Sequence, residues 1–282
     1  MKLLRIGELG QEKPAIIDEQ GNYRDLSAHL DDISSANLSA AALAKISAVD
    51  LSTLPVLAKD SRIGACVADV SKFVCIGLNY ADHAAESGMA IPEQPVVFNK
   101  WTTAICGPND PIVKPKESTK LDWEVELGIV IGTTAKNVSE EQANDYIAGY
   151  CLINDVSERA FQLDISGGQW DKGKGCDSFG PLGPWLVTKD EVDDVLNLAM
   201  TLEVNGKRFQ NGNTKTMIFK PDFIVSYLSK FMTLKPGDVI STGTPPGVGF
   251  GQTPPVYLNV GDQVKLSIEG LGEQNQTVIA ES

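Results

Sequence analysis

Histidine is scarce in this chain, because only His29 and His83 occur among 282 residues. Two histidines exclude zinc sites built from several imidazoles, such as the H-E-x-x-H helix of metalloproteases. The G-x-S-x-G turn that carries a nucleophilic serine is also missing. His29 stands in an apolar segment, and we interpret it as structural. His83 is therefore the one realistic imidazole for acid–base chemistry.

Clustered positive charge and long apolar runs are missing as well. The chain has 24 Lys and Arg against 37 Asp and Glu, a net charge of -13, and no basic run that would bind nucleic acid. Its apolar stretches are far shorter than a membrane span, and Arg5 interrupts what would be the apolar part of a signal peptide. The five cysteines form no C-x-x-C pair, which is typical of buried thiols in a reducing compartment. We therefore expect a cytoplasmic protein without nucleic-acid or membrane partners.

Strand-like runs dominate what is present. They lie at residues 3–6, 15–17, 73–78, 95–98, 129–131, 200–204, 239–242, 256–258 and 264–268. Residues 1–65 predict a small N-terminal α+β unit, and residues 70–282 predict a larger strand-rich domain of mixed sheets. The Asn205–Gly206 pair predicts a hairpin turn.

Five segments predict helices, and one of them is residues 79–86, a turn that leads into a helix. Residues 40–46 form a short amphipathic run, and Pro221 fits the first turn of a helix that ends near Met232. Ser139–Gln142 is a capping-box pattern that predicts a helix towards Gly149. Residues 156–163 predict another helix, directly after Asp155.

Three acidic residues suggest a metal site. Glu124 and Glu126 are two apart in a strand-like run, so their side chains point to the same face. Asp155 ends a second apolar run, where a sheet would direct a side chain into a pocket. Three carboxylates in one place repel unless a cation joins them, and an all-oxygen ligand set suits Mg²⁺, Mn²⁺ or Ca²⁺. The alternative is a solvated strand face and an unrelated aspartate.

His83 and Glu86 are three residues apart at a predicted helix start, so they share a face. A carboxylate bonded to an imidazole fixes its tautomer and raises its basicity, which makes a general base for water. The alternative is a surface pair on an amphipathic turn.

Asp155, Arg159 and Gln162 are spaced by four and three residues, so a helix would stack them on one face. Arg159 and Gln162 would then reach over a metal held by Asp155. The alternative, an exposed i,i+4 ion pair, leaves Gln162 unexplained.

Two glycine-containing loops complete the candidate residues. Lys174 lies between glycines and could stabilise a developing enolate or oxyanion, although Lys172 is an equal candidate on chemistry alone. Ser241–Gly247 follows a strand directly, so backbone N–H groups near Gly243 and the Thr244 hydroxyl could hold a substrate carboxylate. A simple turn is the alternative for this second loop.

These pieces, in this order, resemble the fumarylacetoacetate hydrolase family over about residues 70–275. The resemblance rests on five segments: Ile76–Glu86, Asp122–Gly128, Asn154–Asp155 with Arg159 and Gln162, Lys174 ahead of Phe179–Pro184, and Ser241–Gly247. It implies mixed β-sheets rolled around a metal site, usually in a homodimer.

The resemblance also implies roles for the candidate residues. Glu124, Glu126 and Asp155 would bind Mg²⁺, with Mn²⁺ or Ca²⁺ as alternatives, and water would replace a fourth acidic ligand that some members have. His83 and Glu86 would activate water, and Lys174, which matches better than Lys172 by its distance from Pro181, would stabilise an enolate. The substrate contacts would be Arg159, Gln162 and Thr244.

The activity implied is metal-dependent hydrolysis of a C–C bond in a 2,4-diketo acid, giving pyruvate and a carboxylic acid. The N-terminal sequence and the Lys174 loop are most similar to bacterial members that cleave 2,4-diketo-3-deoxy sugar acids. Ureidoglycolate lyase, oxaloacetate-type decarboxylase and dienoate isomerase are alternatives within the family. A protein that only binds a keto acid is the non-enzymatic alternative.

Overall fold

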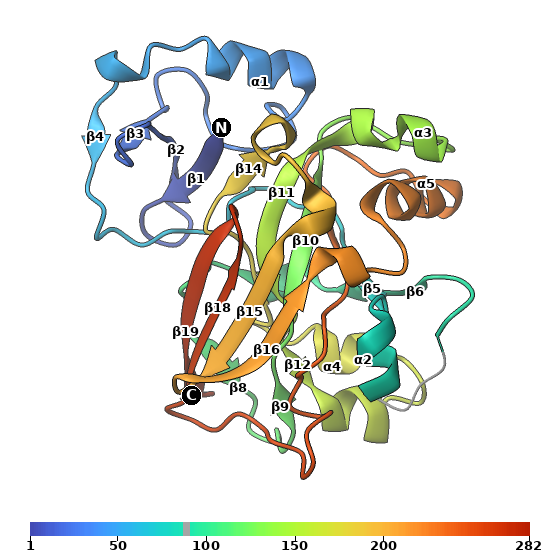
Figure 1. Cartoon of the computed structure of the whole chain (residues 1–282). Coiled ribbons are helices and arrows are strands. Elements are labelled where there is room, and N and C mark those ends of the chain that lie inside the picture. Colours follow the sequence, from blue (N-terminus) through green and yellow to red (C-terminus); the bar gives the residue numbers. More distant parts are fainter. Residues whose placement is uncertain (87–90) are drawn as a thin grey trace.

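The structure is a computed structural model that describes residues 1–86 and 91–282, with the side chains of residues 83–85 left out. Its largest feature is a ten-stranded mixed sheet that runs through the whole molecule (Figure 1). Neighbouring strands are antiparallel except for the parallel pair β17–β5. In spatial order the strands are β4 (Val56–Leu57), β3 (Tyr23–Asp25), β2 (Lys13–Ile17), β1 (Lys2–Ile6), β14 (Leu186–Thr188), β11 (Ile147–Asn154), β10 (Val125–Ile131), β17 (Val239–Ser241), β5 (Phe73–Gly77) and β6 (Val96–Lys100).

A five-stranded sheet packs against this large sheet. Its order is β16 (Lys207–Asn213), β15 (Ala199–Val204), β18 (Gln263–Ile268), β19 (Gly272–Ala280) and β8 (Ile112–Lys114). The predicted hairpin turn joins β15 to β16, and Asn205 and Gly206 both have positive φ, 52° and 77°. Two short pairs complete the strands: β9 (Leu121–Asp122) with β12 (Ser157–Glu158), and β7 (Ile105–Cys106) with β13 (Gly180–Pro181).

The helices are few and short. They are α1 (Ala40–Ser47), α2 (Ala81–Glu86), α3 (Glu140–Ala143), α4 (Asp171–Lys174) and α5 (Pro221–Phe231). A π-helical turn spans Ala160–Asp164, and 3₁₀ turns span Leu51–Thr53, Thr102–Ala104, Asn144–Tyr146, Lys189–Glu191, Val195–Asn197 and Thr214–Thr216. Both α1 and α5 confirm the sequence predictions, and Ser39 caps α1 by accepting from the Ala42 N–H. None of the described helices is long and apolar enough to cross a bilayer.

Three predicted elements are wrong. The helix that begins after Ser139 ends at Ala143 and is followed by a 3₁₀ turn. The apolar run from Ile147 does not continue it, because this run forms β11 and pairs with β10 and β14. Residues 156–163 do not form one helix, because Ser157 and Glu158 pair with β9 before the π-helical turn. Residues 256–258 do not form the predicted strand. The Val256 N–H donates to the Gly249 carbonyl and the Leu258 N–H to the Leu121 carbonyl, so these residues do not pair with one neighbouring strand.

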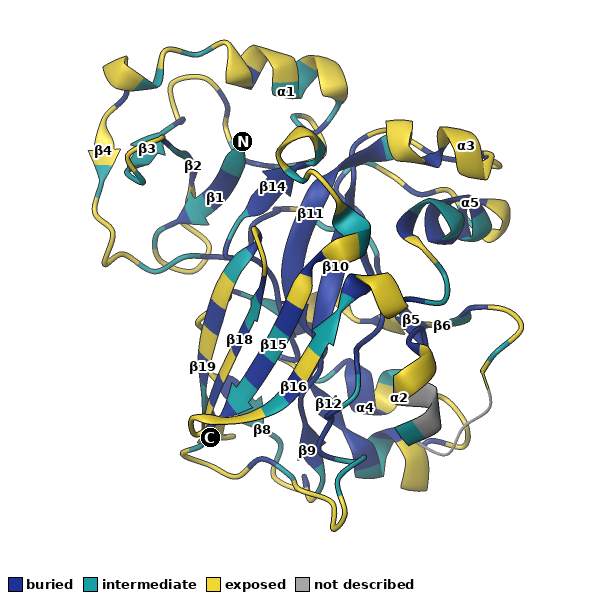
Figure 2. Cartoon of the chain, in the orientation of Figure 1, coloured by how far each residue is buried: buried dark blue, intermediate teal, exposed yellow. Residues whose placement is uncertain are grey.

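Both faces of the large sheet are covered, because its central strands β10 and β11 are buried along their whole length (Figure 2). On one face, Val125, Leu127 and Ile129 of β10 pack with Met200 and Leu202 of the five-stranded sheet. The opposite face packs against the N-terminal segment, in a cluster that includes apolar residues of β1, β5 and β11. The strand-rich α+β architecture predicted from the sequence is therefore confirmed.

The N-terminal strands belong to the large sheet. β1 pairs with β14, with Lys2 opposite Val187 and Leu3 opposite Leu186. The large sheet contains strands from both sides of the domain boundary that was expected between residues 65 and 70. The division into two domains therefore stays a prediction.

The turn after β2 contains a carboxylate whose ionisation is coupled to folding. Asp18 accepts hydrogen bonds from the Gln20 and Asn22 N–H groups, the Asn22 side chain and Arg24 Nε. Burial raises the pKa of Asp18, but the bonds from Asn22 and Arg24 outweigh it and lower the pKa from 3.8 to about 2. A lowered folded-state pKa stabilises the fold above pH 4, and this contribution is lost as the pH falls towards 2.

We therefore expect Asp18→Asn to be less stable than the wild type at pH 7, with a difference that shrinks as the pH falls from about 4 to about 2. Urea unfolding at several pH values measures this difference. Asp31→Asn, at an exposed position, serves as the control. A difference that did not change with pH would contradict the assignment.

Candidate metal and catalytic site

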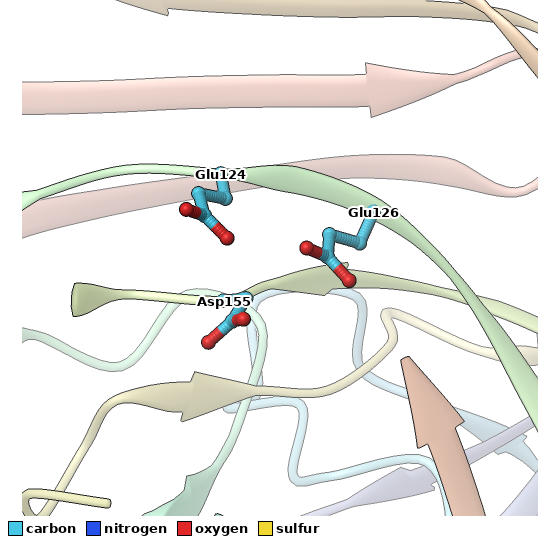
Figure 3. A group of neighbouring side chains, drawn as sticks. All are labelled: Glu124, Glu126 and Asp155. Carbon is cyan, nitrogen blue, oxygen red and sulfur yellow. The ribbon is translucent and has the colours of Figure 1, made fainter. Parts of the chain in front are cut away.

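Three carboxylates from neighbouring strands converge in the interior (Figure 3). Glu124 precedes β10, Glu126 lies within it, and Asp155 follows β11; Val125 faces Asn154 in the ladder between the two strands. Their ligand atoms all lie within 4.8 Å of one another. The three residues are 0–5% exposed, which excludes the solvated strand face.

Three cationic side chains surround this acidic group. Lys174 Nζ lies 2.8 Å from both Glu124 Oε2 and Asp155 Oδ2. Arg159 Nη2 lies 2.5 Å from Glu124 Oε1. Lys100 Nζ lies 2.6 Å from Asp155 Oδ1, in an ion pair whose angles do not make a hydrogen bond. The expectation that the carboxylates need a metal to coexist is too simple, because side chains already supply much of the positive charge.

Glu126 differs from the other two carboxylates. Its Oε2 accepts from the Ser241 hydroxyl at 2.6 Å and from the Gly243 N–H at 2.7 Å. Among the described residues, no donor reaches its Oε1. Burial, then Asp155 and Glu124, raise the pKa of Glu126 well above its ordinary value. The local environment therefore disfavours its negative charge unless a further cation is present.

The residues present fit a divalent ion. Every ligand atom is a carboxylate oxygen, as Mg²⁺, Mn²⁺ and Ca²⁺ prefer. Asp122 adds a fourth carboxylate through its bond to Arg159, so this group of seven side chains carries four negative and three positive formal charges. An additional cation would reverse that remaining negative charge and could bind Glu126 Oε1.

Lys174 is fully within this site, whereas the Lys172 side chain is exposed. Burial lowers the pKa of Lys174, but Asp155 and Glu124 outweigh it and raise the pKa, so the ammonium keeps its charge. The prediction that Lys174 lies in a loop is wrong, because it ends helix α4. The glycine before it allows close packing of the chain itself, because a Cβ on Gly173 would lie 2.4 Å from the Gln162 N and the Glu158 O.

Arg159 and Gln162 meet as predicted, although not on a regular helix. Arg159 Nη1 donates to Gln162 Oε1 at 2.9 Å, and Nε donates to Asp122 Oδ2 at 2.7 Å. Burial lowers the pKa of Arg159, but Asp122 and Glu124 outweigh it and raise the pKa further. The guanidinium also donates to Glu124 and links it to Asp122, so its clearest structural task is to orient Glu124. Substrate contact stays a prediction for both residues.

Glu86 lies at the end of α2, beside the Ser241–Gly247 loop. The Gly247 N–H lies 3.0 Å from both of its carboxylate oxygens, and Gly251 packs against it. The His83 backbone belongs to α2, but its side chain lies outside the described residues. The predicted water-activating dyad therefore stays a prediction.

The loop after β17 is less open to ligands than predicted. The Gly243 N–H is taken by Glu126, so it is not free for a substrate carboxylate. The Thr244 hydroxyl donates to the Val125 carbonyl at 2.9 Å and accepts from Gln210 Nε2 at 2.8 Å. Thr244 does line the cavity, and its contact with substrate stays a prediction.

Sequence reasoning missed two members of the site. Asp122 accepts from Arg159 and from the N–H groups of Trp123, Gly249 and Phe250. It precedes Glu124 by two residues, so the strand alternation could have placed it on the same face. Lys100 could have been found in the same way, because it follows buried Phe98 by two residues while Asn99 between them is exposed.

A small cavity opens above the carboxylates. Its volume is about 40 Å³, room for only a few water molecules. Glu124, Glu126 and Lys174 lie at one end, and Gln162 and Thr244 also line it.

Lys100 offers a stability test. Its buried ammonium donates to the Val156 and Lys174 carbonyls besides pairing with Asp155. Removing one partner of a buried ion pair costs about 3–5 kcal/mol, so we expect Lys100→Met to lower the free energy of unfolding by that amount. Lys120→Met is the control, because its pair with Asp164 is exposed and worth about 1 kcal/mol or less. Equal losses in urea unfolding would contradict the role of Lys100.

Comparison with known proteins places the chain in a family. Residues 72–279 match the sequence model described as fumarylacetoacetate (FAA) hydrolase C-terminal. The chain therefore belongs to the fumarylacetoacetate hydrolase family, as its motifs predicted. A relative from Burkholderia ambifaria is 62% identical over 98% of both chains and carries a provisional name as a hydrolase, without a substrate.

Solved structures of the family include different activities. A 2-hydroxyhepta-2,4-diene-1,7-dioate isomerase from Mycobacterium marinum is 35% identical, with a TM-score of 0.75 over 100% of this chain and 99% of that one. Maleylpyruvate hydrolase from Sphingobium sp. SYK-6, solved with manganese(II) and pyruvate, is 26% identical, with a TM-score of 0.83 over the full length of both chains. The family match alone therefore does not decide between hydrolysis and isomerisation.

Proposed function

We propose that the protein is a Mg²⁺-dependent hydrolase that cleaves the C3–C4 bond of a 2,4-diketo acid. The observation that carries the proposal is the buried group of Glu124, Glu126 and Asp155, with the Lys174 ammonium between two of them and a cavity above. Manganese(II) and pyruvate in the related maleylpyruvate hydrolase support the same class of chemistry.

Glu124, Glu126 and Asp155 would hold the ion, which would supply Lewis-acid polarisation of the keto-acid oxygens when bound. The charges are consistent with such a ligand. The seven side chains carry one net negative formal charge, and a divalent cation with a monoanionic keto acid would make the site neutral.

The side chains of the protein would carry the proton and charge transfers. His83, held by Glu86, would take a proton from water, and the hydroxide would add to the C4 carbonyl. The C3–C4 bond would then break, with its electron pair passing into the enolate of pyruvate. Lys174 would stabilise that negative charge until C3 is protonated, which leaves pyruvate and a carboxylic acid.

The direct test is pyruvate release from acetylpyruvate and related 2,4-diketo acids, with Mg²⁺ or with EDTA, in the wild type and in His83→Ala. We expect release that requires the ion and falls by about 10²–10⁴-fold in the variant, the range of general-base catalysis. Pyruvate from oxaloacetate alone, unaffected by the variant, would indicate decarboxylation and overturn the proposal.

Isomerisation is the second candidate, since isomerases are among the similar structures. It needs no water-derived hydroxide, so a dienoate would change its absorbance without releasing pyruvate. Ureidoglycolate, assayed for glyoxylate and urea, tests the lyase alternative. Binding of keto acids without turnover of any of these compounds would indicate a non-enzymatic binding protein.

A further inference from the structure

The cavity has two unlike ends. Its inner end carries the buried charges of Glu124, Glu126 and Lys174. Its remaining wall is largely apolar, formed by Leu78, Phe98, Leu163, Trp170, Val248 and Phe250. Leu163 is 36% exposed, and Leu78, Trp170 and Phe250 are half-buried, so this apolar part reaches the surface and forms the mouth.

Contacts between residues hold this apolar wall in place. The rings of Phe98 and Trp170 pack with centroids 5.4 Å apart. Gly77 makes room for the indole, because a Cβ there would lie 2.4 Å from Trp170 Cζ3. The Phe250 ring lies 5.9 Å from the Arg159 guanidinium, which the acidic residues hold in turn. The Phe250 side of the mouth is thus connected, through Arg159, to the residues that order the inner end.

Polar groups available to a substrate are few along this wall. Gln162 Oε1 accepts from Arg159, and the Thr244 hydroxyl already donates to one protein group and accepts from another. Among the described lining side chains outside the charged inner end, the free N–H donors are the Gln162 amide nitrogen, the Trp170 indole nitrogen and the second N–H on each Arg159 Nη atom. The other side chains of the apolar wall carry no polar atoms, so a substrate hydroxyl that left water for this wall would lose more hydrogen bonds than it regained, which is unfavourable.

We propose that the mouth selects a hydrocarbon tail on the substrate, an alkyl or aryl group at C4, over a hydroxylated one. This inference rests on the proposed function, because the charged inner end must hold the keto-acid head. With the head at the charged inner end, a tail at C4 would point outwards and lie against the apolar residues that line the rest of the cavity. The selection runs against the sugar-acid substrate expected from the family resemblance.

A pair of substrates that differ by one hydroxyl tests the selection. Propanoylpyruvate and its 5-hydroxy derivative have the same carbon skeleton, and kcat/KM for pyruvate release with Mg²⁺ compares them. We expect at least a tenfold preference for propanoylpyruvate, and about a threefold to fourfold gain for each methylene added up to pentanoylpyruvate. Equal or better turnover of the 5-hydroxy compound would overturn the inference and leave the hydrolase function intact. Release from neither would overturn both.

Two substitutions on one segment connect the preference to the mouth. Leu163→Asn places an amide on the apolar wall, and we expect it to reduce the tenfold preference to about threefold or less. Ile165→Asn is the matched control, since Ile165 is 64% exposed and does not line the cavity. The ratio of the two kcat/KM values is measured, so a general loss of active protein cancels. An unchanged ratio in Leu163→Asn, or an equal change in the control, would overturn the role of the mouth.

Discussion

Replacing Glu126 with Gln is expected to lower metal-dependent turnover by about 10³-fold without unfolding the protein. Glutamine keeps the shape of the side chain and can still accept from Ser241 and Gly243, but it removes the negative charge from a group whose other oxygen has no donor in the described part of the chain. A bound ion stabilises the charge of the transition state by several kcal/mol. Since about 1.4 kcal/mol of activation free energy changes the rate tenfold, loss of the ion should lower kcat/KM by about 10³-fold. Calorimetric titration should show Mn²⁺ affinity lower by at least about 100-fold.

The unfolding free energy separates this effect from damage to the fold. Burial and the neighbouring carboxylates disfavour the charge on Glu126, so the metal-free variant should be at least as stable as the metal-free wild type. Glu117→Gln, at an exposed position, is the control and should change nothing. Wild-type metal affinity in Glu126→Gln would remove this residue from the ligand set.

Replacing Lys174 with Met should separate catalysis from metal binding. The ammonium contacts Glu124 and Asp155 and faces the cavity, so its loss removes charge stabilisation from the reaction. We expect kcat to fall by about 10²–10³-fold, as for other electrostatic contacts to a developing oxyanion. Metal affinity should be unchanged or higher, since one competing cation is gone.

Lys172→Met controls for this substitution, because the two lysines lie on the same helix and only Lys174 is buried. Turnover in that variant should stay within about twofold of the wild type. A parallel loss of metal affinity and kcat in Lys174→Met would indicate that the lysine only holds the carboxylates in place.

The sequence predicted the part of the site that depends on local geometry. Glu124 and Glu126 share a face because alternation along an extended chain requires it, and Gln162 reaches Arg159 because a spacing of three also brings side chains together in a π-helical turn. The choice of Lys174 over Lys172 depended on the family motif alone, since the two lysines have the same chemistry.

The remaining errors come from contacts distant in sequence. The pairing of Ser157 with Asp122 overrides the helical pattern of residues 156–163, and no local signal contains it. Lys100 ends β6 and Asp155 follows β11, and the two meet although β10, β17 and β5 lie between their strands in the large sheet. The alternation of side chains along a strand predicts that Lys100 points inwards, but it does not identify Asp155 as its partner.

The hydrogen bonds of Glu126 also have a consequence for synthesis on the ribosome. Its donors, Ser241 and Gly243, follow it by 115 and 117 positions, and β17, which leads into them, inserts between β10 and β5. A nascent chain that ends before β17 exposes a gap in the sheet and an incomplete acidic centre. The protein therefore acquires its centre at a late stage of translation, after most of the sheet has been made.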